Sequence, residues 1–314
     1  MKRRNNHIVE RVVRESLRSH RFSKVVATVS GGADSVALLS VLSGCRGLRL
    51  LVAHCNFHLR GEESMRDQRV VESLCRNLGV ELLVRDFDVD GYISGRRGVS
   101  VEMACRELRY EWFRSLMREH GADRIATGHN ADDNIETLFL NLMRGSGTSG
   151  LKGMTDDTGE VWRPMLAVHR RDIVAYLEER GIGYITDSTN LVSDYRRNFI
   201  RNEVLPLLRT RWLGLDTALD RTLRHLREES LVVAYAVEGV LPEEGEPLTR
   251  ERVLSFPSPE LLVRRFIENA GPFTTTAGEV VAAMRADKSD VRRWRLSAGT
   301  LELRGGRLYV MPDA

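Results

Sequence analysis

The residues best suited to chemistry lie in a short glycine-rich turn near the N-terminus, TVSGGADS at residues 28–35. An apolar run at 24–29 predicts a strand before the turn, and the apolar segment 36–42 predicts a helix after it. Backbone N–H groups at the start of a helix have no partner within the helix, and the helix dipole adds partial positive charge there. The sequence therefore predicts a phosphate site at this turn.

The turn differs from the common ATPase loop because it has no GK[ST], and so no lysine for the terminal phosphates. An acid, Asp34, stands at the expected helix start instead, and a carboxylate beside phosphates is favourable mainly when Mg²⁺ lies between them. Gly31 and Gly32 let the backbone approach an anion closely. Ser30 and Ser35 add hydroxyl donors. The alternative is an ordinary turn whose serines and aspartate cap the helix.

A second polar segment, GHNADDNIET at 128–137, opens another expected helix. At about 100° per residue, Asp132 and Glu136 fall at the border of its apolar stripe, and Asp133 falls on the opposite side. A carboxylate turned partly toward a core is costly unless it meets a cation, so we expect a metal ion or an ammonium group nearby. Capping of the helix N-terminus explains the two aspartates but not Glu136, one turn further in.

Polar residues also lie at and just after the end of the expected strand at 48–55. They are His54, Asn56, His58 and Arg60. The carboxyl end of a strand is the ligand side of an open α/β sheet, so these side chains are expected beside the first turn. A polar connection between strand and helix is the alternative.

Two further segments carry cations. The glycine-rich stretch 144–154 is predicted to be a mobile cover or hinge without a helix or strand of its own, and its Lys152 suits a phosphate contact. A simple connector is the alternative. Arg196, Arg197 and Arg201 gather just before the expected domain boundary, where a solvated helix face is the alternative.

The segments that must position these residues follow a regular alternation. Expected strands lie at residues 24–29, 48–55, 81–87 and 125–128. Amphipathic helices separate them, which favours an α/β domain with a doubly wound, mainly parallel sheet. We expect this domain to span residues 1–208. A small α+β domain is expected at 209–314, with a long helix at 212–240 and, at its end, a β-meander or paired hairpins.

Composition narrows the class of protein. The 314 residues suffice for two domains, and 42% hydrophobic and 29% charged residues are ordinary for a soluble protein. No apolar run approaches the roughly 20 residues of a membrane span, and the first residues are not signal-like, so we expect a cytoplasmic protein. The four cysteines form no C-x-x-C pair, which favours reduced thiols. All but four of the 47 basic residues are arginine, which fits an RNA partner or a GC-rich genome.

In chain order, the motifs resemble those of bacterial tRNA(Ile)-lysidine synthetases, members of the PP-loop ATPase superfamily. The similar segments are SGGADS at 30–35, HCNFHLRGEESMRD at 54–67, TGHNADDNIET at 127–137, RGSG at 144–147, RPML at 163–166, DSTN at 187–190 and YRRNFIRNEVLP at 195–206. The resemblance is dense over residues 22–208 and mainly architectural beyond. It implies an adenine nucleotide alpha-hydrolase-like PP-loop domain.

That resemblance implies a ligase that uses ATP and Mg²⁺. Such an enzyme adenylates the C2 oxygen of the wobble cytidine in the CAU-anticodon isoleucine tRNA and releases pyrophosphate. Free L-lysine then displaces AMP to give lysidine. The implied partners are this tRNA and lysine, with no membrane. The longest family members carry an additional C-terminal domain, so a shorter tRNA-binding face is expected to rely more on the domain cleft or on a second subunit, and a homodimer is therefore a further expectation.

The resemblance also assigns roles to residues. The implied ATP-binding residues are Ser30, Gly31, Gly32, Ala33, Asp34, Ser35, His54, Asn56 and Gly128, with Asp34 holding Mg²⁺ beside the phosphates. The implied catalytic residues are Asp34, His129 and Arg201. For the lysine substrate, Arg109 is implied to bind the carboxylate, and Asp133 and Glu136 the ammonium groups.

Three other functions remain open at this point. A PP-loop tRNA thiolation enzyme normally needs C-x-x-C pairs, which this chain lacks. An amidotransferase-coupled synthetase of the NAD or GMP type would carry a glutaminase or another substrate domain, which the last hundred or so residues do not resemble. A non-catalytic nucleotide sensor would not require the acids Asp132 and Glu136.

Overall fold

The chain folds into two compact units, Met1–Leu226 and Arg227–Ala314. The computed structural model describes residues 7–186, 196–268, 277–286, 291–296 and 299–312. The division between the units falls inside helix α11 (Leu215–Glu238). The first turns of α11 belong to the first unit because Leu219 and Leu223 pack against Ile135.

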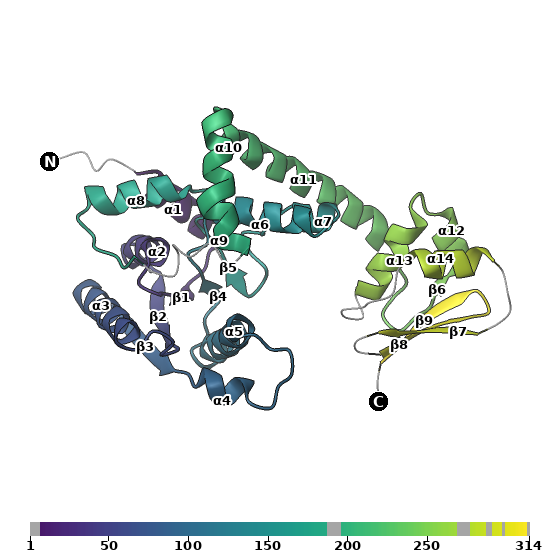
Figure 1. Cartoon of the computed structure of the whole chain (residues 1–314), viewed down its shortest axis with the longest axis horizontal. Coiled ribbons are helices and arrows are strands. Elements are labelled where there is room, and N and C mark those ends of the chain that lie inside the picture. The colour runs from purple at the N-terminus through teal and green to yellow at the C-terminus, as the bar shows by residue number, and fades with distance from the viewer. Residues whose placement is uncertain (1–6, 187–195, 269–276, 287–290, 297–298, 313–314) are drawn as a thin grey trace. The chain divides into compact units, whose positions relative to one another are not determined.

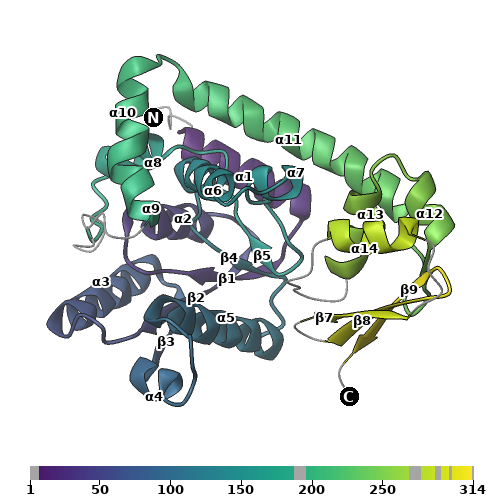
Figure 2. The ribbon, with the colours of Figure 1, turned by 45° about the vertical axis from the view of Figure 1, so that its right-hand side comes forward.

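The first unit is built on a five-stranded parallel sheet in the order β3-β2-β1-β4-β5 (Figures 1 and 2). Its strands are β1 (Lys24–Thr28), β2 (Arg49–Asn56), β3 (Glu81–Asp86), β4 (Arg124–Ala126) and β5 (Val161–Trp162). The chain adds β2 and β3 on one side of β1 before it adds β4 and β5 on the other. This reversal confirms the doubly wound α/β fold, and the crevice between β1 and β4 is where such sheets bind ligands.

Helices cover both faces of this sheet (Figure 2). They include α1 (Ile8–His20), α2 (Ala33–Ser43), α3 (Glu62–Leu78), α4 (Val89–Ile93), α5 (Val101–Glu119), α6 (Ala131–Met143) and α8 (Arg170–Glu179). Val25 and Ala27 of β1 face α1, α2 and α8, whereas Val26 faces α5. Successive side chains of a strand point to opposite faces, so a strand covered on both sides reads as a continuous apolar run. No described helix is long and apolar enough to cross a lipid bilayer.

The glycine-rich stretch 144–154 contains a short helix, α7 (Thr148–Leu151), so the prediction that it holds no helix or strand was wrong. Two side-chain amides of α6 bind its backbone. The amide of Asn141 donates to Gly150 at 2.8 Å, and the amide of Asn134 accepts from Met154 at 2.7 Å. These hydrogen bonds stabilise a conformation that the glycines alone would not specify.

Past residue 195 the chain returns to α6. Helix α9 (Arg196–Phe199), the π-helical turn η2 (Ile200–Val204) and α10 (Leu205–Arg211) follow one another without a break. Ile200 and Leu205 pack in one apolar cluster with Ile135 and Leu138 of α6. The arginines of this segment are therefore brought to the helix that carries the predicted acids. The DSTN motif at 187–190 lies outside the described residues.

The second unit is a small α+β domain, as predicted. Strands β7 (Arg292–Leu296), β8 (Gly299–Arg304) and β9 (Arg307–Pro312) form the expected antiparallel meander, and β6 (Leu248–Thr249) pairs with β9. Its described helices beyond α11 are α12 (Arg250–Ser255), α13 (Pro259–Glu268) and α14 (Ala277–Arg285). Leu262, Val280 and Leu301 meet in its apolar core.

A charge cluster joins α8 to the start of α11. His169, which precedes α8, has Nδ1 3.3 Å from Asp132 and Nε2 2.9 Å from Asp220. Hydrogen bonds to Asp132 and then to Asp220 raise the pKa of His169 to about 10. Burial raises the pKa of Asp132, but hydrogen bonds from His169 and Arg209 outweigh burial and lower it. The imidazolium therefore acts as a structural cation between two segments far apart in sequence.

This cluster predicts a pH-dependent stability. The folded pKa of His169, about 10, lies above the ordinary value of 6.5, so its stabilisation is complete below pH 6.5 and is lost as the pH rises through 10. His169→Gln should cost roughly 2 kcal/mol at pH 6, and the loss should shrink toward pH 10. Thermal unfolding at several pH values measures it. The exposed His225→Gln is the matched control, and a deficit that stays constant with pH would contradict this role.

Candidate functional site

The glycine turn lies at the switch point of the sheet, between β1 and α2. The Ser35 hydroxyl accepts from the N–H groups of Ser30 and Gly31, both at 3.2 Å, and donates to the carbonyl of Gly32 at 2.9 Å. Gly31 has φ of +94°, and a side chain there would collide with Ile185. Ser35 is thus engaged within the turn and sets its shape, while Ser30 is exposed at its rim.

The segment after β4 touches the turn. A Cβ atom on Gly128 would lie 3.0 Å from backbone atoms of Asp34 and Ser35. The absence of a side chain therefore lets this segment approach the backbone of the turn closely. Asn130, the N-cap of α6, donates to Asp34 Oδ1 at 3.0 Å and accepts from the backbone of Asp133 at 3.1 Å. The start of α6 and the glycine turn therefore form a single site.

The Asp34 carboxylate meets a cation that the sequence analysis did not anticipate. Arg170, the first residue of α8, places Nη1 2.6 Å from Asp34 Oδ2. Burial raises the pKa of Asp34, while Arg170 and the Asn130 amide act in the opposite direction. The Asp34 side chain keeps 24% of its surface exposed. It is thus a partly open carboxylate at the start of a helix, already paired with a guanidinium.

The acids of α6 are paired as well. Glu136 is fully buried and lies 2.6 Å from Nε of both Arg197 and Arg201. Asp133 Oδ1 accepts from Nη2 of each arginine at 3.0 Å. Positive charge was expected here as a metal ion or an ammonium group. The structure instead supplies it from two guanidinium groups. Asp132 turns elsewhere, toward His169 and Arg209.

His129 lies beside these acids as a neutral imidazole. Its Nδ1 is 2.7 Å from the hydroxyl of Thr127. Burial lowers the pKa of His129 to about 4, and Asp133 offsets only part of that effect. At neutral pH the ring therefore carries no net charge. If Nδ1–H donates to Thr127, then Nε2 is a free proton acceptor.

The side chains of two predicted ATP-binding residues of β2 are buried and make hydrogen bonds within the protein. His54, 4% exposed, donates from Nδ1 to the carbonyl of Val29 at 2.8 Å. Asn56, 2% exposed, donates to Gln68 at 2.8 Å. The His54 side chain thus braces β2 against the glycine turn, whereas the Asn56 side chain ties the end of β2 to α3. Similarly, Ala33 is buried in the core and leaves 2% of its surface exposed.

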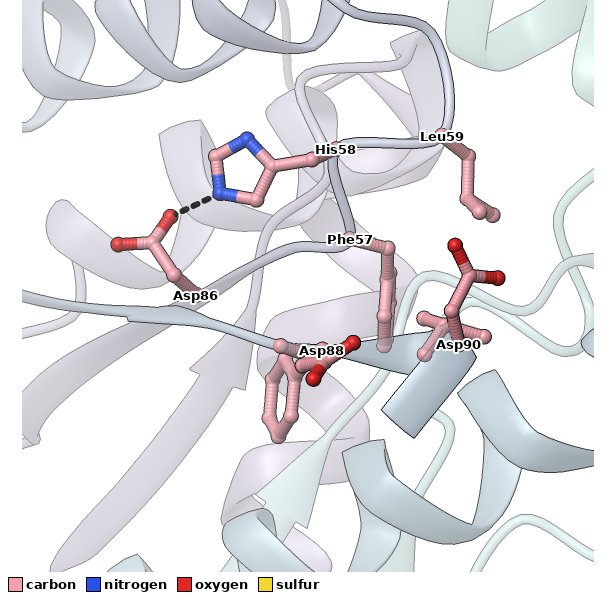
Figure 3. A pocket seen from close by; sticks show the side chains of 8 residues that line it. Phe57, His58, Leu59, Asp86, Asp88 and Asp90 are labelled. Carbon is pink, nitrogen blue, oxygen red and sulfur yellow. Dashed lines mark hydrogen bonds and ion pairs between the residues drawn. The ribbon is translucent and has the colours of Figure 1, made fainter. Parts of the chain in front are cut away.

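A hollow of about 660 Å³ lies beside the carboxyl ends of β2 and β3 (Figure 3). It is lined by Phe57, His58, Leu59, Asp86, Phe87, Asp88, Val89 and Asp90. His58 Nε2 lies 2.6 Å from Asp86. Because three carboxylates line this hollow, it does not suit a phosphate. The exposed Arg109 lies over the ring of Phe57 at 5.4 Å, and no ion pair joins it to Asp133 or Glu136 in the described structure.

Sequence reasoning missed three members of this site: Thr127, Asn130 and Arg170. Asn130 and Asp133 have the N-cap and N3 spacing of a capping box, and the structure forms that box, so a local signal existed. Arg170 is 136 residues from Asp34 in the chain, and no local pattern reports such a pair.

Comparison with known proteins adds independent information. Residues 5–208 match the PP-loop domain family. The tRNA(Ile)-lysidine synthase of Bacteroides thetaiotaomicron is 42% identical over 260 residues, which cover 81% of this chain and 60% of that protein. The one from Porphyromonas gingivalis strain W83 is 47% identical over 215 residues, which cover 68% and 47%. The chain thus spans about half to three fifths of the length of these curated relatives.

A solved structure is similar to this chain over most of its length. The U34-tRNA thiolase NcsA from Methanococcus maripaludis, with its [4Fe-4S] cluster, matches with a TM-score of 0.58 at 18% identity and covers 70% of this chain and 78% of that one. At this identity the likeness concerns the fold alone. The family match spans the glycine turn, the parallel sheet and the acids of α6 together, and the chain belongs to the PP-loop family.

Proposed function

We propose that this chain is a tRNA(Ile)-lysidine synthetase. The C2 oxygen of the wobble cytidine would bond to the α-phosphorus of ATP as pyrophosphate leaves. An amine of lysine would then form the C–N bond as AMP leaves. The curated relatives support the choice of substrates. The observation that carries the chemistry is the pairing of a partly open Asp34 with Asn130 at the junction of the glycine turn and α6.

The residues of the turn fit ATP and Mg²⁺. Helix α2 has no side-chain cap, so the N–H groups of its first turn remain available for phosphate oxygens. Gly31 and Gly32 leave room for close approach, and the Ser30 hydroxyl is exposed at the rim. Bound Mg²⁺ would offset phosphate charge, and Asp34 is the carboxylate placed to hold it.

His129 is suited to proton transfer in the second step. An attacking ammonium group must lose a proton, and a neutral imidazole can accept it. The low pKa of His129, about 4, keeps its ring neutral at physiological pH but also makes it a weak base, so its role depends on its position beside the reacting amine. Arg201 pairs with Asp133 and Glu136, and its charge also acts on Asp34. We assign His129 to proton acceptance and Arg201 to charge stabilisation.

Lysine binding requires an exchange of cations. Asp133 and Glu136 carry two negative charges, and the two guanidinium groups of Arg197 and Arg201 balance them. An ammonium group therefore gains little unless one arginine withdraws. Arg197 makes two hydrogen bonds to the carboxylates and is 40% exposed, whereas Arg201 makes three and is 28% exposed. We assign the withdrawal to Arg197. Arg109 remains our candidate for the lysine carboxylate.

The wider assignments follow from the same proposal. The second unit, with basic residues on its strands such as Arg293 and Arg304, would contact tRNA phosphates. A homodimer would enlarge that surface. The substrates would place the protein in the cytoplasm.

The main alternative, tRNA thiolation, requires a reactive thiol. Burial raises the pKa of Cys55 to about 12 and that of Cys75 to about 11. Burial also raises the pKa of Cys45 and Cys105. A thiolate is the reactive form, so the environments of these cysteines disfavour sulfur transfer. This observation and the curated relatives together favour the lysidine reaction.

The direct test is nucleoside analysis of the CAU-anticodon isoleucine tRNA after incubation with the protein, ATP, Mg²⁺ and lysine. We expect lysidine together with AMP and pyrophosphate. No lysidine should form when lysine is left out or when an unrelated tRNA is supplied. Sulfur incorporation without any lysine requirement would support the thiolase instead. Nucleotide binding without turnover would support a sensor.

Asp34→Asn should reduce pyrophosphate release by roughly 100-fold or more, because a neutral amide cannot hold the metal beside the phosphates. The near-isosteric change keeps a group at hydrogen-bond distance from Asn130, so the melting temperature should stay close to that of the wild type. Activity within a few-fold of wild type in a folded variant would remove Asp34 from the metal site.

The exchange of cations predicts effects of opposite sign on lysine use. Glu136→Gln should raise the KM for lysine about tenfold, a change of about 1.4 kcal/mol, with little change in the KM for ATP. Arg197→Met should lower the KM for lysine, because a competing cation is gone. Arg196→Met, at the exposed neighbouring position, is the matched control. A raised KM for lysine in the Arg197 variant would show that the arginine supports the site instead of vacating it.

A further inference from the structure

We infer that Arg170 supplies the cation for the pyrophosphate end of ATP. The inference rests on the proposed function and extends it to a residue outside the recognised motifs. The glycine turn lacks the lysine by which common ATPase loops hold terminal phosphates. Among the described residues, the ion pair made by the turn is the one between Asp34 and Arg170.

The position of Arg170 suits this role. Its backbone N–H donates to Asp132 Oδ2 at 2.8 Å, which anchors the main chain at the start of α8. Its side chain is 40% exposed, and Nη1 lies 2.6 Å from Asp34 Oδ2. A fixed backbone with a partly solvated guanidinium lets the cation move locally while it stays beside the turn. The remaining N–H groups of the guanidinium suit phosphate oxygens.

The charges at the turn explain why Arg170 would change partners. Without a metal ion, the carboxylate of Asp34 is partly buried and needs a cation, which Arg170 provides. Asp34 would hold Mg²⁺ in place of this ion pair, and the Arg170 guanidinium, which lies beside the turn, would then be available to phosphate oxygens. Charge-assisted and bidentate hydrogen bonds to phosphate are among the strongest that a side chain makes. Arg170 would then stabilise the charge that builds up on departing pyrophosphate.

A purely structural role for Arg170 predicts something different. If the arginine only holds Asp34 in position, its loss should weaken the binding of a metal ion and of pyrophosphate alike. If it competes with the metal for Asp34 and then binds pyrophosphate, its loss should leave metal binding equal or tighter and weaken pyrophosphate binding. The two measurements together separate these roles.

Calorimetry with inorganic pyrophosphate in excess Mg²⁺ tests the inference on the full chain. Arg170→Met should weaken pyrophosphate binding about tenfold or more. Arg170→Lys should recover part of the loss because lysine restores the charge but not the two parallel N–H donors of a guanidinium group. The matched control is Arg171→Met, since Arg171 is 69% exposed and pairs with Asp216 at 3.3 Å. In parallel, Mn²⁺ binding without pyrophosphate should be unchanged or tighter in Arg170→Met.

Pyrophosphate affinity within twofold of wild type in a folded Arg170→Met variant would overturn the inference, as would parallel loss of Mn²⁺ binding. The result is distinct from a failure of the proposed function. Pyrophosphate binding needs neither tRNA nor lysine, so wild-type protein that binds pyrophosphate through Arg170 but forms no lysidine would refute the function alone.

Discussion

Carboxylates held beside the apolar core need cations, and this requirement organises the whole site. Glu136 is fully buried, and burial raises the pKa of Asp34. Each of these carboxylates lies 2.6 Å from a guanidinium group. Removing a charge from water is costly unless an opposite charge and hydrogen bonds replace the lost solvation. The three acids of the site, with Asp133 included, are matched by three arginines from later parts of the chain.

This balance connects the fold to the chemistry. The acids come from the starts of α2 and α6, which follow neighbouring strands β1 and β4. The arginines come from the starts of α8, α9 and the π-helical turn η2, which the chain reaches only after the sheet is complete. A site with balanced charge can accept cationic ligands in place of its own arginines, and each released arginine becomes available to an anion. In the proposed reaction both kinds of ligand meet at this site.

Much of the scaffold was predictable because its signals are local. Apolar runs, turn residues and helical periodicity identified strands β1 to β4 of the parallel sheet but not the two-residue strand β5, and the glycine turn was placed correctly at the end of β1. The second unit was recognised as α+β for the same reason. Helix α7 was missed because its glycines indicate a loop, and hydrogen bonds from Asn134 and Asn141 of α6 hold the conformation instead. These bonds depend on how the segment folds back, which periodicity does not report.

The amino-acid sequence by itself determined the doubly wound parallel class of the sheet, the glycine turn at the end of β1 and the need for a cation beside Glu136, since each follows from neighbouring residues. Only the tertiary structure decided which cation meets which acid. The arginine that pairs with Asp34 lies 136 residues away along the chain, and the two that pair with Glu136 lie 61 and 65 residues away. The tertiary structure also directs Asp132 away from the site, toward His169 and Arg209. Pairing of buried charges depends on distances in space, and these exist only once the sheet and its helices have packed.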